Sequence, residues 1–238
     1  MAASDQALRI AQEAVDEAAS RDHPIPICIS LIYASPCLLW TGDLLGAGDL
    51  IERLIEHAGR HSLEPYRVTG IALKGELAIA REEPEAGLDL LRSALDALRT
   101  LQYNLQITQF ISASAEGLRK TGQFEEALFA IDGAIARARN TGLEVHLSEM
   151  LRVKSQILAA RGDRQSAMGC LTEGVAVARA QSALAWELRS TIALARLLSD
   201  DGQRDQARHT LALVYERFTE GFETADLRLA RALLEDLR

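Results

Sequence analysis

Apolar residues recur at three- and four-residue intervals along most of this 238-residue chain, in segments separated by short polar stretches. Between residues 124 and 138, for instance, Phe124, Ala127, Ile131, Ala134 and Ala138 follow this spacing. Because an α-helix has 3.6 residues per turn, such residues form one apolar stripe along a helix. The chain therefore reads as a series of amphipathic helices joined by tight turns.

The pattern repeats every forty residues without insertion or deletion. Small residues mark the period at Ala47, Gly87, Ala127, Ala167 and Ala207. An aliphatic residue follows each of them by four positions, and a glycine precedes four of the five by five positions. A glycine there suits the left-handed residue that ends a helix, and a small residue at the next helix start allows two helices to approach closely. Each copy is thus one helix–turn–helix pair.

We therefore expect an all-α fold, a right-handed α-solenoid of five helix pairs that stack to bury their apolar stripes. The chain is expected to be a single domain with a half-repeat helix at residues 1–21, five repeats at residues 22–221 and a capping helix at residues 222–238. The first helices are expected at about 25–41, 65–81, 104–121, 144–161 and 184–201. The second helices are expected at about 44–61, 84–101, 124–140, 164–180 and 204–219.

Composition supports a helical protein and excludes several classes. Alanine and leucine supply 75 of the 238 residues, whereas aromatic residues make up 5%, which excludes an all-β fold. The net charge of −8 shows no basic surplus, so direct nucleic-acid binding is not expected. We expect no apolar run to approach the roughly 20 residues of a membrane span, and therefore no membrane role. The three cysteines and the absence of a secretory signal favour the cytoplasm.

Residues 121–135, TGQFEEALFAIDGAI, resemble a tetratricopeptide repeat. That repeat is about 34 residues long, whereas this one has forty, so the chain looks like the longer tetratricopeptide-like repeats in sensor regions of bacterial signal-transduction ATPases. The stretches WELR, LAR and FTEGFETADL within residues 183–237 are similar to the C-terminal ends of large bacterial regulators. Those regulators place a winged-helix or cyclase domain and an ATPase domain before the repeats. The resemblance implies a sensor or protein-interaction region, with an upstream ATPase or output domain as one possible partner.

No catalytic, metal or cofactor site is predicted. The G-x-S-x-G and phosphate-loop motifs are absent. His57 and His61 stand four apart on an expected helix, but the glutamate that a zinc hydrolase places after the first histidine is missing. We expect both histidines to lie on the surface and the protein not to be an enzyme.

The resemblance implies that first helices line a concave face. Carried over by register, the polar candidates for binding there are Glu76, Glu116, Arg119, Lys120, Arg152, Gln156, Arg189 and Arg196. Arginine suits an anionic peptide or a small anion because its guanidinium offers a fork of donors. The alternative is that these charges only solvate an inner wall.

The first helix of copy one offers an apolar set instead: Ile29, Ile32, Leu39 and Trp40. This set is expected either to be covered by the helix at residues 4–20 or to join another domain or a second copy. Two functions remain open: a protein-interaction or sensor scaffold in bacterial signal transduction or transcriptional regulation, and a stand-alone peptide or small-anion receptor.

Overall fold

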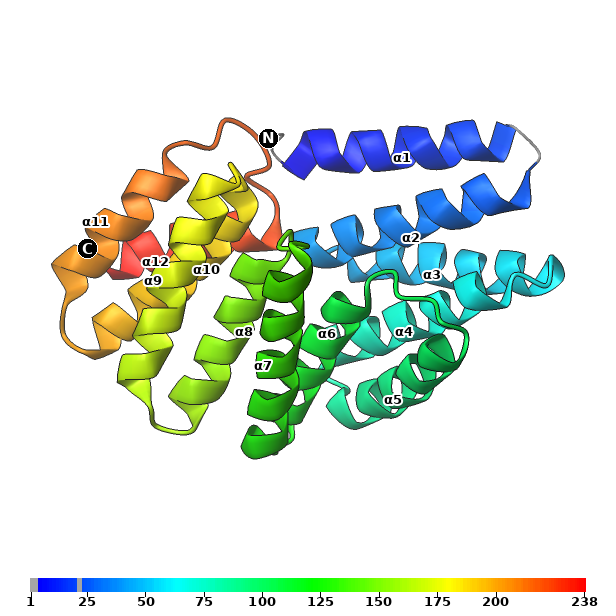
Figure 1. Ribbon diagram of the computed structural model, residues 1–238. Coiled ribbons are helices and arrows are strands. Elements are labelled where there is room, and N and C mark those ends of the chain that lie inside the picture. Colours follow the sequence, from blue (N-terminus) through cyan, green and yellow to red (C-terminus); the bar gives the residue numbers. More distant parts are fainter. Residues whose placement is uncertain (1–3, 21–22) are drawn as a thin grey trace. The chain divides into compact units, whose positions relative to one another are not determined.

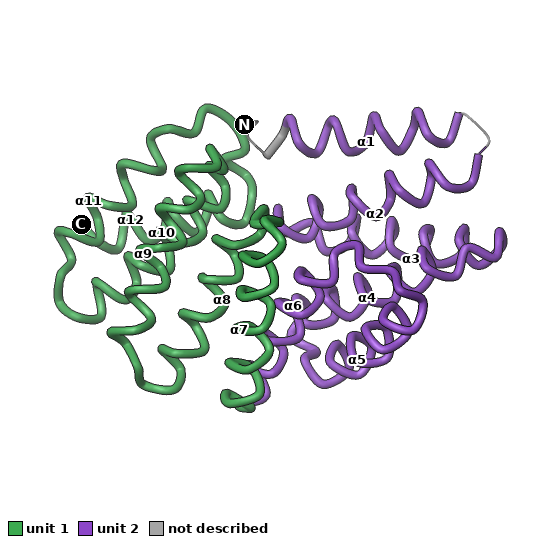
Figure 2. Tube along the Cα trace, viewed as in Figure 1, with its two compact units in different colours: residues 1–4, 122–238 green, residues 5–121 purple. Residues whose placement is uncertain are grey.

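The computed structural model describes residues 4–20 and 23–238, and in these ranges it contains twelve helices and no strand (Figure 1). The predicted all-α fold is confirmed. Residues 1–3 and 21, part of the predicted half-repeat segment, lie outside the described residues. The chain divides into two compact units, unit 1 with residues 1–4 and 122–238 and unit 2 with residues 5–121 (Figure 2). The expectation of a single domain stays a prediction.

Unit 2 contains α1 (Ser4–Ser20) from residue 5 onward, α2 (Pro24–Thr41), α3 (Leu44–Arg60), α4 (Glu64–Ala80), α5 (Pro84–Thr100) and α6 (Ile107–Lys120). From α2 onward each helix packs against the next one in sequence. The first helices also pack against one another, α2 on α4 and α4 on α6. The unit thus shows the two sets of contacts expected of stacked helix pairs.

Unit 1 contains α7 (Phe124–Thr141), α8 (Leu147–Ala160), α9 (Arg164–Ala180), α10 (Leu184–Asp200), α11 (Arg204–Tyr215) and α12 (Ala225–Asp236). Its helices pack in the same sequential order, and α10 also contacts α8 and α12. Leu227 and Ala230 of α12 are buried and stand forty residues after Glu187 and Ser190. The predicted capping helix therefore occupies the register of a sixth first helix.

The predicted helix boundaries hold to within a few residues, with three informative differences. The helices expected to begin at 104 and 144 begin at Ile107 and Leu147. The residues before them form turns, closed in the second case by the Leu147 amide donating to the Glu144 carbonyl at 2.9 Å. The helix expected to end at 219 ends at Tyr215, and Gly221 takes a positive φ six residues later.

A residue with positive φ ends the helices at twenty-residue intervals. These residues are Gly42, Ser62, Glu82, Gln102, Gly122, Gly142, Gly162, Ser182 and Gly202. In most of these turns the next amide reaches back five residues, as when Asp43 donates to the Leu38 carbonyl at 3.0 Å. This is the hydrogen bond of the Schellman motif, which satisfies carbonyls left open at a helix end. The structural unit is therefore one helix and one turn, and two such units make the forty-residue repeat.

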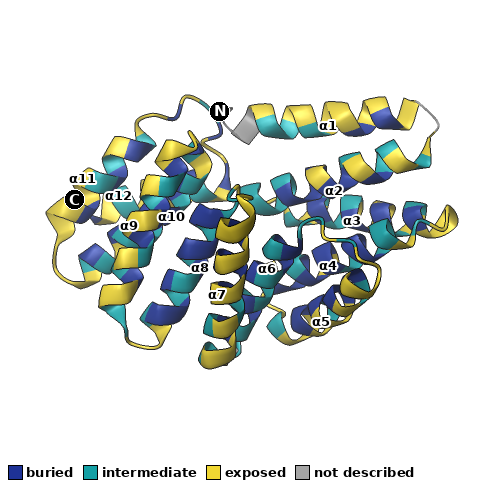
Figure 3. Ribbon diagram, in the orientation of Figure 1, coloured by how far each residue is buried: buried dark blue, intermediate teal, exposed yellow. Residues whose placement is uncertain are grey.

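The small residues at the starts of the second helices lie where helix pairs close on each other. Ala47, Ala127, Ala167 and Ala207 are fully buried, as Figure 3 shows for the inner faces of the helices in general. At the fifth position, a Cβ added to Gly87 would lie 2.7 Å from the Gly75 carbonyl oxygen. No side chain fits at that distance, so α4 and α5 touch through their backbones.

Helix α2 is long and apolar enough to cross a membrane by length and composition alone. The expectation that no segment approaches this character was therefore too strong. About a third of α2 is buried, and Cys28, Leu31, Ile32 and Ala34 belong to the core of unit 2. Core helices of water-soluble proteins pass the same test.

Candidate binding surface on the first helices

In unit 2 the polar candidates lie on α4 and α6. The Gln109 side-chain amide on α6 donates to Glu76 Oε2 on α4 at 2.8 Å. Gln109 is 6% exposed, and its Oε1 atom is buried without a hydrogen-bond partner among the described residues. A buried acceptor of this kind carries a desolvation cost unless a ligand or water satisfies it. Gln109 and Glu76 therefore join two first helices and leave one acceptor open.

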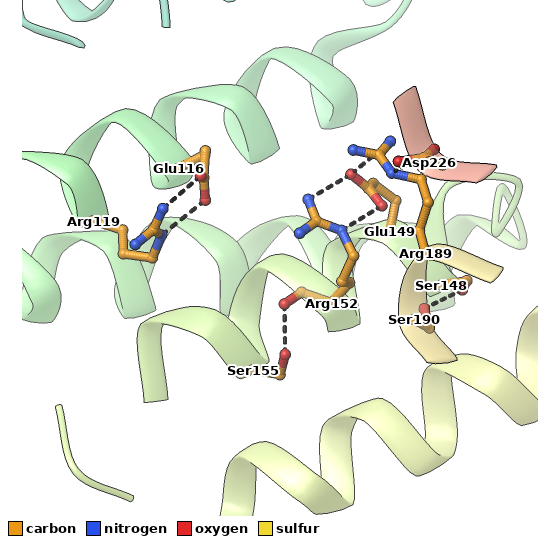
Figure 4. Close-up of polar contacts among 9 residues, drawn as sticks. All are labelled: Glu116, Arg119, Ser148, Glu149, Arg152, Ser155, Arg189, Ser190 and Asp226. Carbon is orange, nitrogen blue, oxygen red and sulfur yellow. Dashed lines mark hydrogen bonds and ion pairs between the residues drawn. The ribbon is translucent and has the colours of Figure 1, made fainter. Parts of the chain in front are cut away.

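The basic candidates of α6 are both paired with carboxylates. Arg119 donates to Glu116 in a two-pronged contact, Nε to Oε2 at 3.0 Å and Nη2 to Oε1 at 2.7 Å (Figure 4). Lys120 Nζ donates to Glu82 Oε1 at 2.7 Å, and this hydrogen bond lowers the pKa of the Glu82 carboxyl. Because each basic group already has an acidic neighbour, neither presents a bare positive charge.

In unit 1 the candidates of α8 and α10 form a denser cluster, shown in Figure 4. Arg152 donates to Glu149 through Nε and Nη2, both at 2.8 Å. Arg189 of α10 places Nη1 3.2 Å from Glu149 Oε1 and Nε 3.6 Å from Asp226 Oδ2 of α12. The side chains of Arg152 and Glu149 are only 12% and 16% exposed. Two arginines and two carboxylates thus alternate across three helices.

The pKa values of the two carboxyl groups in this cluster are shifted in opposite directions. Burial by itself raises the pKa of Glu149, but Arg152 and Arg189 outweigh it and bring that pKa down to about 2. At Asp226 burial dominates, and the nearby Glu149 charge adds to it, so the pKa of Asp226 is raised although Arg189 opposes the shift. Glu149 is therefore the firmly ionised partner of both arginines.

An aromatic side chain extends the cluster. The Arg189 guanidinium lies 5.3 Å from the centre of the Trp186 ring, within range of a cation–π contact. The His146 ring meets Trp186 edge-on at 6.4 Å, and burial lowers the pKa of His146. Trp186 therefore contacts both the candidate Arg189 and the ring of His146.

Two candidates in unit 1 stand apart from the ion pairs. Arg196 of α10 is exposed and has no ion-pair partner in the described part of the chain. Gln156 of α8 is half-buried, and its Oε1 atom is buried without a hydrogen-bond partner in residues 4–20 and 23–238. The two residues occupy the same register position, forty residues apart, on helices that pack together.

The apolar candidates of α2 divide into two kinds. Ile29 is 41% exposed, and Leu39 and Trp40 are half-buried. Ile32 is fully buried in the core of unit 2, so it does not reach the surface. Ile25 and Tyr33, which the sequence did not single out, are also exposed on this helix.

The histidine pair lies at the end of α3. The rings of His57 and His61 are 4.6 Å apart, and burial together with the neighbouring His61 lowers the pKa of His57. No group of three or more possible metal ligands occurs in the residues that the structure describes.

Sequence reasoning missed Glu187, the most buried carboxylate of unit 1. Its side chain is 1% exposed, with Arg179 Nε 3.0 Å from Oε1 and Arg217 Nη1 2.7 Å from Oε2. It ties the end of α9 and the segment after α11 to α10. A signal was present, because the register equivalents Ile107 and Leu147 are apolar, and an acidic residue in such a column needs buried partners.

Comparison with solved structures places this fold among tetratricopeptide-like repeat proteins. BtubC (BKLC) from P. vanneervenii superposes with a TM-score of 0.61 at 15% identity, over 91% of each chain. The tetratricopeptide-like repeats of a putative kinesin light chain from Podosopora anserina give 0.53 at 18% identity, over 91% of this chain and 99% of that one. A variant of those repeats gives 0.55 at 19% identity, over 82% and 95%.

No family model matches the sequence, and no curated protein matches it either. The structural likeness therefore establishes the fold alone, which is a tetratricopeptide-like helical repeat.

Proposed function

We propose that this chain is a non-enzymatic scaffold that binds a partner protein, peptide or inducer through the exposed face of its first helices. The repeat class supports this reading, because stacked helix pairs present an extended surface that such proteins use for binding other proteins. We further propose that it acts in the cytoplasm in bacterial signal transduction or transcriptional regulation, and that its partner is an ATPase or output domain. The resemblance of residues 183–237 to bacterial regulators supports this finer role.

The observation that carries the proposal is the pair Gln156 and Arg196. They share one register position on adjacent first helices, and each offers hydrogen-bonding capacity that the described residues leave unused. A side chain whose only role is to face water is not expected to bury a hydrogen-bond acceptor without a partner. A bound peptide that places a carboxylate on Arg196 and draws the Gln156 amide outward into a hydrogen bond would use both.

The ion pairs give this surface a fixed shape. Arg152 and Arg189 are held by Glu149, so little side-chain entropy remains to be lost when a ligand contacts their outer donors. The pairing also reduces their net charge. An acidic ligand is therefore expected to be bound mainly through Arg196, with the paired arginines supplying hydrogen bonds.

A matched pair of charge reversals tests the proposal. Arg196→Glu, combined with Gln156→Ala, alters the first-helix face of unit 1. Arg208→Glu makes the same charge change on α11, a second helix where Arg208 is also exposed. Partners captured from a bacterial lysate and quantified by mass spectrometry are expected to be retained by the wild type and Arg208→Glu but lost by the double variant. Identical partner lists for all three proteins would contradict the proposal.

A stand-alone receptor for a peptide or small anion is the second candidate. The cation–π contact between Arg189 and Trp186 favours it, because an arginine held over an aromatic ring and paired with Glu149 offers its remaining donors in a fixed position to a carboxylate or phosphate. A ligand that binds only the native state raises the melting temperature in a saturable way. A thermal-shift screen with acidic peptides and phosphorylated metabolites is expected to give such a rise if this function holds, and Trp186→Ala should remove it.

A further inference from the structure

Arg189 of α10 lies between two carboxylates that belong to two other helices of unit 1. Its Nη1 atom is 3.2 Å from Glu149 Oε1 on α8, and its Nε atom is 3.6 Å from Asp226 Oδ2 on α12 (Figure 4). The side chains of Arg189 and Asp226 are 21% and 26% exposed. A dissolved ligand therefore has access to the contact between Arg189 and Asp226.

Arg189 is paired in charge, but its hydrogen bonds are poor. Its Nη1 atom is buried and has no hydrogen-bond partner among residues 4–20 and 23–238, although Glu149 is close. The 3.6 Å between Arg189 Nε and Asp226 is longer than the roughly 2.7–3.2 Å of an N–H···O hydrogen bond. Arg152, by contrast, donates two hydrogen bonds to Glu149, both at 2.8 Å. Glu149 thus serves mainly Arg152, and Asp226 is left as the loose counter-ion of Arg189.

Of the two carboxylates beside Arg189, Asp226 is the less well stabilised. Burial raises the pKa of the Asp226 carboxyl, and the charge of Glu149 adds to this shift, whereas Arg189 only opposes it. The pKa of Glu149 is instead lowered to about 2. A carboxylate with a raised pKa loses more by leaving water than its partners return to it. Moving the Asp226 side chain back into water therefore costs little.

Two contacts that do not involve Asp226 hold the Arg189 guanidinium. It lies 5.3 Å from the centre of the Trp186 ring, and Glu149 is 3.2 Å away on the other helix. His146 contacts Trp186 edge-on at 6.4 Å. An arginine held in this way has little side-chain freedom left to lose when an oxyanion binds to it.

The start of α12 leaves the Asp226 side chain free to move. Asp226 lies in the first turn of this helix, and the residue before the helix, Thr224, makes no side-chain hydrogen bond to it. The Thr224 hydroxyl donates instead to the Gly221 carbonyl at 2.8 Å. Leu227 and Ala230, which are buried, anchor the helix further along. The Asp226 side chain can therefore turn outward while α12 stays docked.

We propose that Asp226 is an internal competitor that occupies a binding site for an external carboxylate, built from Arg189 and Trp186. The incoming carboxylate displaces the Asp226 side chain and accepts two hydrogen bonds from the Arg189 guanidinium. The charge balance of the cluster is kept, because one carboxylate replaces another. While Asp226 stays in place, an anion meets Arg196 first. This inference rests on the second candidate function and names its ligand group and the residue that limits its affinity.

Binding of a fluorescein-labelled tetraglutamate peptide to the full chain, followed by anisotropy, tests the competition. Asp226→Asn is expected to bind the peptide at least about tenfold more tightly than the wild type, because the competitor is gone. Asp205→Asn is the matched control, since it makes the same charge change at an exposed residue in the first turn of α11. The control should keep the dissociation constant within about twofold of the wild type. A purely structural role of Asp226 predicts no gain in affinity.

Variants of the arginine locate the site. In the Asp226→Asn background, Arg189→Lys keeps the charge but removes the planar fork of donors, so it should cancel the gain in affinity. Arg208→Lys in the same background should leave the gain intact, because Arg208 is exposed on α11. Competition by free glutarate distinguishes a small acid from a peptide as the source of the carboxylate. Circular dichroism melting curves of every variant separate a folding defect from a binding defect.

Three results would overturn the proposal. The first is an Asp226→Asn protein that binds the peptide no more tightly than Asp205→Asn does. The second is tight binding that survives Arg189→Lys, and the third is equal binding of a tetraglutamine peptide. Failure of the second candidate function looks different, because saturable binding is then missing from the wild type and Asp226→Asn alike.

Discussion

Replacing Gly87 by alanine is expected to destabilise the protein, although alanine is the better helix former. Gly87 lies in α5 where it crosses α4, and an added Cβ would lie 2.7 Å from the Gly75 carbonyl oxygen and 2.5 Å from Ile79 Cγ1. The first of these atoms is backbone and cannot rotate away. The two helices must therefore separate or shift for a single methyl group to fit.

The magnitude follows from two opposing effects. Alanine gains up to about 1 kcal/mol over glycine in a helix interior. Overpacking a closed interface costs about 1–3 kcal/mol. Because the obstacle is backbone, we expect the upper part of that range and a net loss of about 1–2 kcal/mol in the free energy of unfolding. A loss of this size lowers the melting temperature by about 2–4 °C per kcal/mol for a chain of this length.

Replacing glycine by alanine at two other helix positions should not lower the stability of the protein. At Gly133 of α7 nothing lies within 4 Å of an added Cβ, and at Gly59 of α3 the nearest atom is the flexible Arg67 Cδ at 3.8 Å. Gly133→Ala and Gly59→Ala are therefore expected to be neutral or stabilising by up to about 1 kcal/mol. Urea unfolding followed by circular dichroism measures all three variants. A Gly87→Ala protein as stable as Gly59→Ala would refute the close approach of α4 and α5.

Three further substitutions test the packing and the electrostatics. Glu149→Gln should lower the free energy of unfolding at pH 7 by about 3 kcal/mol, because the carboxyl pKa falls from 4.5 to about 2 on folding. In urea titrations the stability difference between wild type and variant should be full above about pH 5 and vanish as the pH falls to about 2. A difference that does not depend on pH would exclude the ion pairs as its cause. Glu187→Ala should cost about 1–3 kcal/mol by calorimetry, since it removes a buried acceptor of two arginines, and no change would mean that the pairs are not formed in solution. Ala127→Leu should cost about 1–3 kcal/mol through overpacking, and an unchanged melting curve would contradict the forty-residue register.

The positions of the helices could be predicted because the apolar period and the small residues are local signals. Ala47 and Ala127 occupy the predicted helix contacts and are fully buried. The turns were only half predicted. Gly122 and Gly162 predicted a residue in the left-handed conformation, and both adopt it. Ser62, Gln102 and Ser182 adopt the same conformation although they are not glycine. The hydrogen bonds of the Schellman turn hold them there, and residue type does not reveal such bonds.

The sequence predicted which residues lie on the first helices of the site, but not which of them form ion pairs with one another. The register placed Arg152 and Arg189 on first helices, and both lie there. That they share Glu149, and that Asp226 of α12 joins them, depends on how α8, α10 and α12 pack. Charge partners brought together by tertiary packing leave no mark in the spacing of one sequence. Because Arg152 and Arg189 are already paired with carboxylates, we expect an anion to bind mainly at Arg196.

Hydrogen–deuterium exchange of the full chain, with and without a captured partner, tests the scaffold role most directly. We expect slowed exchange on the first helices of the repeats, above all on the peptides of α8 and α10 that contain Gln156 and Arg196. Peptides of the second helices, such as that of α11 around Arg208, should exchange at the same rate in both states. Protection confined to the second helices, with the first helices unchanged, would contradict the claim that the first-helix face binds the partner.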